Sequence, residues 1–237
     1  MIPREADIRT RIEAVRQKIA AACERVGRNP NEVILVAVTK TVPIETIKLA
    51  YVAGIRNFGE NRVQEAATKI SPAFLREFGS DTPAPQWHLI GHLQTNKVKK
   101  ALELFQIIQS VDSLRLAEAL QRHVAAMQQR MEVFIEVNTS GEPSKFGVSP
   151  NQALQLAALP NLQLTGLMTI GALTDNQNII RGCFRQLRDL RAEIAAANLP
   201  GVNLQHLSMG MTDDFEVAIE EGSTMVRVGR AIFGARG

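Results

Sequence analysis

Lys40 is the residue whose position most strongly suggests covalent chemistry. It ends the run VILVAVTK at 33–40, in which the preceding residues are nearly all apolar. Burial at such a strand end disfavours the charged ammonium, and a neutral lysine amine can attack an aldehyde to form a Schiff base. The same pattern also fits a lysine whose side chain extends from the strand end into solvent.

Two small-residue turns near the end of the chain offer a place for a phosphate. They contain Ser208 and Gly210 in SMGM, and Gly229 and Arg230 in GRA. Each turn is predicted to lead from a strand into a helix, where exposed backbone N–H groups bind phosphate well. Simple turn glycines would give the same pattern. A Schiff-base lysine beside a phosphate site points to pyridoxal 5′-phosphate (PLP), which carries both an aldehyde and a phosphate.

Arg227 lies two residues before Gly229 on the same predicted strand, so the two residues face the same side. Its guanidinium is therefore expected to face the ring of a cofactor whose phosphate is held by the turn. Because a guanidinium only donates hydrogen bonds, it would leave the pyridine nitrogen unprotonated and weaken PLP as an electron sink. An aspartate is the usual partner where a strong sink is needed.

Three other groups of residues have weaker claims to chemistry. His88 and His92 lie on a predicted strand and its turn without an acidic third ligand, so no metal site is predicted. Asp213 and Asp214 fit the acid-rich start of a helix. Lys145, in a long polar loop, is either a second amine near the site or a solvated side chain.

The elements that would position these residues alternate regularly between strand and helix after one N-terminal helix. Such alternation is typical of parallel strands joined by helical crossovers, and eight units in this length favour a closed barrel over an open sheet. We therefore predict an α/β fold, a single (β/α)8 TIM barrel with an additional N-terminal helix. Residues 1–30 form the helical segment and 31–237 the barrel, in one domain. The predicted strands are 33–40, 55–58, 87–90, 106–111, 132–137, 164–170, 204–208 and 224–228, and the predicted helices are 5–27, 43–52, 61–77, 95–104, 113–129, 149–158, 176–197, 213–220 and 229–234.

Composition narrows the class of protein. The 237 residues are 45% hydrophobic and 22% charged, which is ordinary for a globular chain. The two cysteines form no CxxC motif, the N-terminus lacks the apolar core of a signal peptide, and no apolar run is long enough to cross a membrane. The net charge of +3 is scattered, and no aromatic residues interleave with the basic cluster around Lys97. We expect a cytoplasmic protein that binds neither nucleic acid nor membrane.

Several segments resemble the YggS/PROSC family of pyridoxal 5′-phosphate-binding (PLP homeostasis) proteins. They run in order over nearly the whole chain, and the last is the most specific. The fold that this resemblance implies is a single barrel similar to the N-terminal domain of bacterial alanine racemase. The matching segments are AVTK at 37–40, FGENRVQEA at 58–66, WHLIGHLQTNK at 87–97, NTSGEPSKFG at 138–147, GLMTIG at 166–171 and LSMGMTDDFEVAIEEGSTMVRVGRAIFG at 207–234.

The resemblance also implies a set of cofactor contacts. It places PLP on Lys40 and sets Arg227 opposite the pyridine nitrogen. The chain differs from the family pattern at Arg62, where an aromatic residue is expected, and at Arg230, where threonine is frequent. The remaining expected contacts are Asn61 beside the ring, Met168 at the end of the sixth strand, and Ser208, Gly210, Gly229 and Arg230 around the phosphate.

The resemblance further implies control of PLP and of amino-acid and keto-acid pools, without robust catalysis. A racemase needs a base on each face of the cofactor plane, and in alanine racemases the base opposite the lysine is a tyrosine. The one tyrosine here, Tyr51, falls late in the first crossover helix, and we expect no second domain. The alternatives are a PLP-dependent racemase of low activity, a Schiff-base aldolase without PLP, and a regulatory interaction protein. We expect a monomer with PLP-dependent apoenzymes as recipients.

Overall fold

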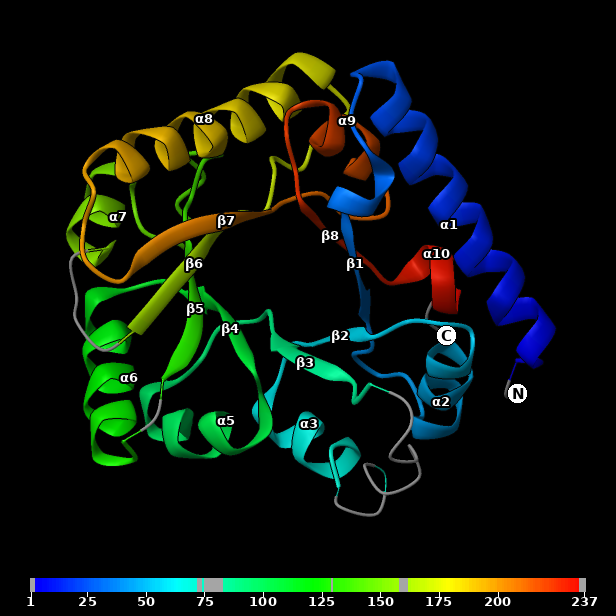
Figure 1. The fold of residues 1–237 in the computed structure, drawn as a ribbon, viewed down its shortest axis with the longest axis horizontal. Coiled ribbons are helices and arrows are strands. Elements are labelled where there is room, and N and C mark those ends of the chain that lie inside the picture. Colours follow the sequence, from blue (N-terminus) through cyan, green and yellow to red (C-terminus); the bar gives the residue numbers. More distant parts are fainter. Residues whose placement is uncertain (1–2, 72–73, 75–82, 129, 158–161, 235–237) are drawn as a thin grey trace.

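The computed structural model describes residues 3–71, 74, 83–128, 130–157 and 162–234, and these form a closed barrel of eight parallel strands (Figure 1). The strands follow one another in chain order, and the barrel closes where Val36 in the first strand pairs with Arg227 in the last. The predicted TIM barrel is confirmed. The strands are β1 (Ile34–Val38), β2 (Asn57–Glu60), β3 (Gln86–Leu89), β4 (Ile107–Val111), β5 (Met131–Glu136), β6 (Leu162–Met168), β7 (Val202–Ser208) and β8 (Met225–Val228).

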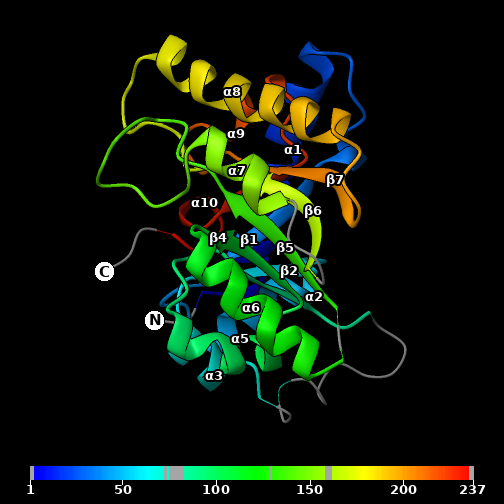
Figure 2. The same ribbon diagram turned by 90° about the vertical axis from the view of Figure 1, so that its left-hand side faces the viewer.

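Helices connect successive strands on the outside of the barrel. Figure 2 views the molecule from the side of α6 and α7, which lie in front of β4, β5 and β6. Local capping fixes several helix starts: the Ser113 hydroxyl accepts a hydrogen bond from the Leu116 N–H, and the Asn176 side chain caps α8 in the same way. The helices are α1 (Glu5–Arg25), η1 (Pro30–Glu32), α2 (Ile44–Val52), α3 (Val63–Lys69), η2 (Thr95–Lys97), α5 (Val98–Leu104), α6 (Leu114–Ala126), α7 (Pro150–Ala157), α8 (Gln177–Ala196), α9 (Phe215–Glu220) and α10 (Arg230–Phe233).

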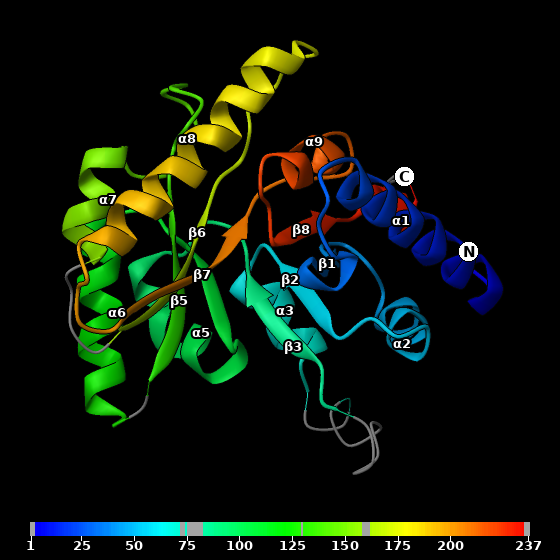
Figure 3. The same cartoon turned by 45° about the horizontal axis from the view of Figure 1, so that its top comes forward.

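The N-terminal helix α1 lies outside the strand–helix repeat and packs against helices on the outside of the barrel. Its buried stripe recurs every three or four residues and packs against α9, α10 and α2 (Figures 1 and 3). The prediction of this helix is confirmed, although it ends at Arg25 and not at residue 27. The stripe consists of Ile8, Ile12, Val15, Ile19, Ala22 and Cys23.

Element boundaries differ from the prediction mainly at strand ends. The first strand ends at Val38, and the backbone of Thr41 then lies in the left-handed region with φ of 63°. The helix predicted over 61–77 is observed as α3, which ends at Lys69; much of the remainder falls on residues outside the described part. Within the described part of the chain, no helix combines the length and apolar character that a membrane crossing requires.

The barrel interior contains both apolar and polar side chains. An apolar cluster inside it includes Phe134, Met168 and Met225, all at most 1% exposed. Several polar side chains are also buried there, among them His88, Gln109, Ser208 and Arg227. A buried polar group is costly unless it is hydrogen-bonded, so the partners of these side chains decide what the interior can do.

Candidate cofactor site

A cavity of about 540 Å³ opens at the carboxyl ends of β1 and β8, the end of a β/α barrel where active sites lie. It contains four of the predicted cofactor residues: Lys40, Arg227, Gly229 and Arg230. Lys40 is half-buried in the turn after β1, and Arg227 is buried within β8. The cavity is lined by Val38, Lys40, Met211, Thr212, Asp213, Arg227, Gly229 and Arg230.

The turn that carries Lys40 is held on both sides by α3. The Lys69 ammonium donates to the Thr39 carbonyl oxygen at 2.7 Å and to Glu65 Oε1 at 2.6 Å. Glu65 Oε1 in turn accepts from the Thr41 N–H at 2.5 Å, which holds that residue in its left-handed conformation. The residues before and after Lys40 are thus both held by α3.

Glu60 completes this cluster from the end of β2. Its Oε1 accepts from Lys69 at 2.7 Å and from the Thr39 hydroxyl at 2.6 Å. Burial raises the pKa of Glu60, against the opposing effect of Lys69. Sequence reasoning placed Glu60 at a strand end but missed Lys69; the four-residue spacing from Glu65 to Lys69 on α3 was the available signal.

Arg227 presents its guanidinium to the same cavity from below. Its Nη1 donates to the Ser208 hydroxyl and its Nη2 to the Thr169 carbonyl oxygen, both at 2.7 Å. Burial lowers the pKa of Arg227 to about 10, while the charges of Glu136 and Asp214 oppose the shift. The guanidinium therefore stays protonated at neutral pH and can only donate hydrogen bonds.

Glu136, at the end of β5, does not line the cavity but acts on Arg227 through its charge, and sequence reasoning missed it. Its side chain is buried, and burial together with the charge of Asp112 raises its pKa to about 7. The charge at this end of the barrel interior therefore changes close to neutral pH. No local motif marks Glu136, because its environment depends on strands that are distant in sequence.

Ser208 and Gly210 lie beneath the cavity and do not line it. The Ser208 hydroxyl accepts from Arg227 and donates to Gln109, and its side chain is inaccessible to solvent. Gly210 has φ of 98°, and a Cβ there would lie 2.6 Å from the Ala218 Cβ, so only glycine fits this turn. Its carbonyl oxygen accepts from the Arg227 N–H at 3.0 Å. Their predicted contact with a phosphate stays a prediction.

Arg230 forms an ion pair with Asp213 across the mouth of the cavity. Both side chains are more than half exposed, so this pair is weakly held and Arg230 can take another anionic partner. The sequence predicts that Asp213 belongs to the acid-rich start of a helix. The helix α9 in fact begins at Phe215, and Asp214 Oδ1 accepts from the Met211 N–H at 2.6 Å.

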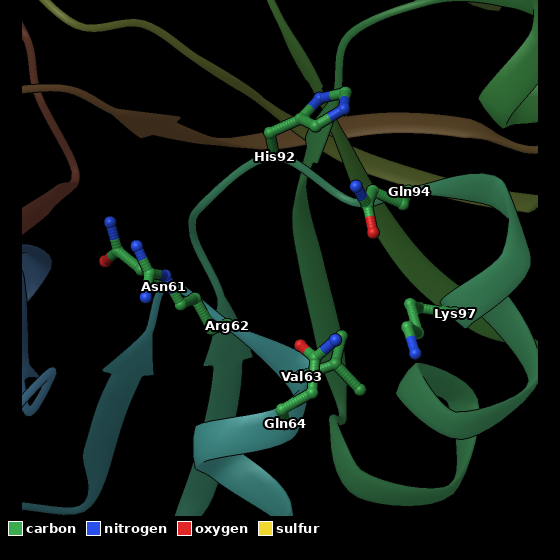
Figure 4. A pocket seen from close by; sticks show the side chains of 7 residues that line it. All are labelled: Asn61, Arg62, Val63, Gln64, His92, Gln94 and Lys97. Carbon is green, nitrogen blue, oxygen red and sulfur yellow. The ribbon is translucent and has the colours of Figure 1, made fainter.

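Asn61 lines a second cavity of about 420 Å³ beside the first, together with His92 and Lys97 (Figure 4). Its Oδ1 is buried and has no hydrogen-bond partner among the described residues, so the amide is available to a bound molecule. A Cβ on Gly91 would lie 2.5 Å from the Asn61 carbonyl oxygen, so the backbone of Asn61 packs closely on that glycine.

His88 and His92 occupy different parts of the protein. His88 lies on β3 as predicted, but its ring lies inside the barrel and also lines a cavity at the opposite, amino-terminal end. His92 contacts Asp112 and stacks on Phe146 with ring centroids 4.4 Å apart. Among the described residues, no three histidine, cysteine or acidic side chains come together as metal ligands.

Met168 and Lys145 do not line the cavity that contains Lys40. Met168 is fully buried in the apolar cluster inside the barrel, below the cavity floor. The Lys145 ammonium donates to the Gly171 carbonyl oxygen at 2.7 Å and pairs with Glu142. Lys145 is thus engaged within the loops at this end of the barrel, and does not line the cavity of Lys40.

Comparison with known proteins places these features in a family. Residues 11–237 match the model of the alanine racemase N-terminal domain. A pyridoxal phosphate homeostasis protein of Aquifex aeolicus is 42% identical over 231 residues, covering 95% of this chain and 97% of that protein. The chain belongs to the family of pyridoxal phosphate homeostasis proteins. The homeostasis protein of Escherichia coli K12 is likewise 42% identical, with 97% of each chain covered. The resemblance to the YggS/PROSC proteins is therefore confirmed.

Solved structures agree with the barrel. PipY of Synechococcus elongatus PCC7942, solved with PLP bound, is 37% identical and superposes with a TM-score of 0.81, covering 96% of this chain and all of PipY. An alanine racemase of Clostridium difficile 630 has a TM-score of 0.72 at 14% identity, and the match spans 98% of this chain but 57% of the racemase. The second similarity shows the fold alone.

Proposed function

We propose that this protein binds PLP as a Schiff base on Lys40 and takes part in intracellular PLP (vitamin B6) and amino-acid/keto-acid homeostasis. The observation that carries the proposal is the single cavity that joins Lys40, Arg227, Gly229 and Arg230. The Lys40 amine matches the aldehyde of PLP, and the buried Arg227 guanidinium matches its pyridine nitrogen. The turn at Gly229 and Arg230 matches its phosphate. The names of the relatives and the PLP-bound PipY support it.

Each residue of the cavity has a distinct task in this proposal. Lys40 would hold the cofactor covalently through its amine at the aldehyde carbon, with the aldehyde oxygen lost as water. Arg227 directs an N–H toward the pyridine nitrogen and leaves it unprotonated. When bound, PLP would supply an electron sink, and this contact would keep that sink weak.

The remaining predicted contacts surround the cofactor. Gly229 and Arg230 offer a backbone N–H and a cation to the phosphate from the turn after β8. Gly210 and Ser208 shape the adjoining turn, and Met168 supports the floor from inside the barrel. Asn61 approaches from the side of β2, where its buried Oδ1 lacks a partner among the described residues.

A carrier role, without robust catalysis, is supported by the position of Tyr51. The hydroxyl of Tyr51 donates to the Pro83 carbonyl oxygen at 2.7 Å, near the start of β3 and therefore at the opposite end of the barrel. It cannot serve as a second base across the cofactor from Lys40. We propose a monomeric cytoplasmic protein in one domain, with PLP-dependent apoenzymes as its recipients.

The proposal is tested by loading and labelling. Protein incubated with PLP should turn yellow, and borohydride should bleach the colour and leave a pyridoxyl group on the peptide that contains Lys40. Lys40→Ala should remove both signals while keeping the far-UV circular dichroism of the wild type. Lys97→Ala, which removes an amine at the same end of the barrel, is the matched control and should behave like wild type. Protein that stays colourless and unmodified after incubation with PLP would overturn the proposal.

A further inference from the structure

A continuous chain of hydrogen bonds crosses the barrel from Arg227 to the amino-terminal ends of the strands. Arg227 Nη1 lies 2.7 Å from the Ser208 hydroxyl, which lies 2.6 Å from Gln109 Oε1. Gln109 Nε2 lies 2.9 Å from His88 Nδ1, and His88 Nε2 lies 3.0 Å from Asn57 Oδ1. The members come from β8, β7, β4, β3 and β2, so the chain joins strands far apart in sequence.

Every bond in this chain has only one possible direction. A guanidinium only donates, so the Ser208 oxygen accepts from Arg227 and its single proton is left for Gln109 Oε1. The Gln109 amide nitrogen also only donates, so His88 Nδ1 must be the unprotonated acceptor. The neutral imidazole then carries its proton on Nε2 and donates it to Asn57 Oδ1. Gln109 Nε2 also donates to Met225 Sδ, and these two atoms lie 3.0 Å apart.

Burial restricts the side chains of this hydrogen-bond chain. The side chains of Ser208, Gln109 and His88 are inaccessible to solvent, and Arg227 is 4% exposed. Ser208 and Gln109 are therefore shielded from bulk water, and in such an interior a broken bond leaves an unsatisfied group. Arg227 is held by a second bond to the Thr169 carbonyl oxygen, so two of its N–H groups fix the guanidinium plane.

The charged and titratable groups around the chain favour this arrangement. Burial lowers the pKa of His88 to about 3, and the neighbouring His206 on β7 adds to the shift, so His88 is neutral at physiological pH. Glu136 on β5 and Asp214 before α9 face Arg227 and balance its charge. The imidazole therefore acts as a fixed tautomer and not as a proton carrier.

We propose that Ser208, Gln109 and His88 are positioning residues, which orient the Arg227 guanidinium toward the cofactor through this one-directional chain anchored on Asn57. The proposal rests on the proposed function for the identity of the ligand. It adds that the contact to the pyridine nitrogen is set from the far end of the barrel. A change at Gln109 should therefore alter the bound cofactor, although Gln109 does not line the cavity.

Nuclear magnetic resonance of the unliganded protein tests the direction of the chain without any cofactor. With histidine labelled in its ring nitrogens, His88 should show one protonated and one unprotonated nitrogen, assigned to Nε2 and Nδ1, unchanged between about pH 5 and 8. In Gln109→Glu the new carboxylate can only accept, so His88 should gain a proton on Nδ1. A merely space-filling role for Gln109 would leave the His88 nitrogens unaltered.

Two further variants test the effect on Arg227. Gln109→Met and Ser208→Ala should each release the guanidinium, so that the separate Nη signals of a rotationally restricted Arg227 merge. They should also weaken PLP binding by about tenfold or more and change the pH dependence of the bound-PLP absorption. Thr165→Val is the matched control: it removes a buried hydroxyl that has no partner among the described residues and should leave Arg227 and PLP binding unchanged.

The outcomes separate this proposal from the proposed function. If wild-type protein fails to bind PLP, the proposed function fails, while the His88 and Arg227 signals still decide whether the chain positions the guanidinium. The proposal is overturned if wild-type His88 titrates in its ordinary range. It is also overturned if the Gln109 and Ser208 variants, folded by circular dichroism, retain the wild-type Arg227 signals.

Discussion

The raised pKa of the buried Glu136 should make the stability of the fold depend on pH. Burial and the charge of Asp112 raise its pKa to about 7 in the native protein, above the ordinary glutamate value of 4.5. A carboxyl group whose pKa is raised in the native state stabilises the fold fully at pH values below its unfolded pKa. This stabilisation is lost as the pH rises through the native pKa. Wild-type stability should therefore fall across this window because the buried carboxyl must ionise.

The Glu136→Gln variant isolates this effect, since it keeps the size of the side chain and removes the proton. Relative to the variant, the free energy of unfolding of the wild type should decrease by about 2 to 3 kcal/mol between about pH 5 and 8. Urea unfolding of both proteins at the two pH values measures the difference. Parallel pH profiles for wild type and variant would contradict the pKa assigned to Glu136.

Single residues were predictable from the sequence where their strand end alone decides their position. Lys40, Arg227, Gly229 and Arg230 follow this rule, because a closed parallel barrel brings the carboxyl ends of β1 and β8 together. Ser208 does not, because its hydroxyl is directed by Gln109, which lies 99 positions away in sequence. Such long-range pairings leave no local pattern.

The packing of helix α1 against the barrel helices is expected to stabilise the fold. Ile12 is fully buried where α1 packs against α9 and α10. Ile12→Ala should lower the free energy of unfolding by about 3 kcal/mol, because it removes buried methyl groups and leaves a cavity. Glu13→Ala, on the exposed face of the same helix, should change it by less than about 0.5 kcal/mol. Chemical unfolding of both variants provides the measurement, and equal stabilities would show that α1 is not docked as described.

Element types were readable from local sequence, whereas their limits depended on contacts across the barrel. The alternation of β-branched runs with helical stripes predicted the eight-unit order, which the strand pairing confirms. The left-handed turn at Thr41 after β1 could not be predicted, because the Thr41 N–H is held by Glu65 from α3. The interior side of His88 likewise depends on register, since neighbouring strands decide which face is enclosed.

The whole protein is expected to hold its cofactor without turning over substrate. Tyr51 is engaged near the start of β3. In the proposed binding mode, Arg227 would leave the pyridine nitrogen unprotonated. PLP-loaded protein incubated with L-alanine for many hours should therefore form no more D-alanine, by chiral chromatography, than free PLP at equal concentration. Formation of D-alanine well above that control would favour a racemase of low activity.

The most direct test of the central claim is the site of covalent labelling. Protein loaded with PLP, reduced with borohydride and digested should carry the pyridoxyl group on Lys40, as read by mass spectrometry. The label should be lost in Lys40→Ala and kept in Lys97→Ala. Labelling on another lysine, with full retention in Lys40→Ala, would contradict the assignment of Lys40 as the residue that holds the cofactor.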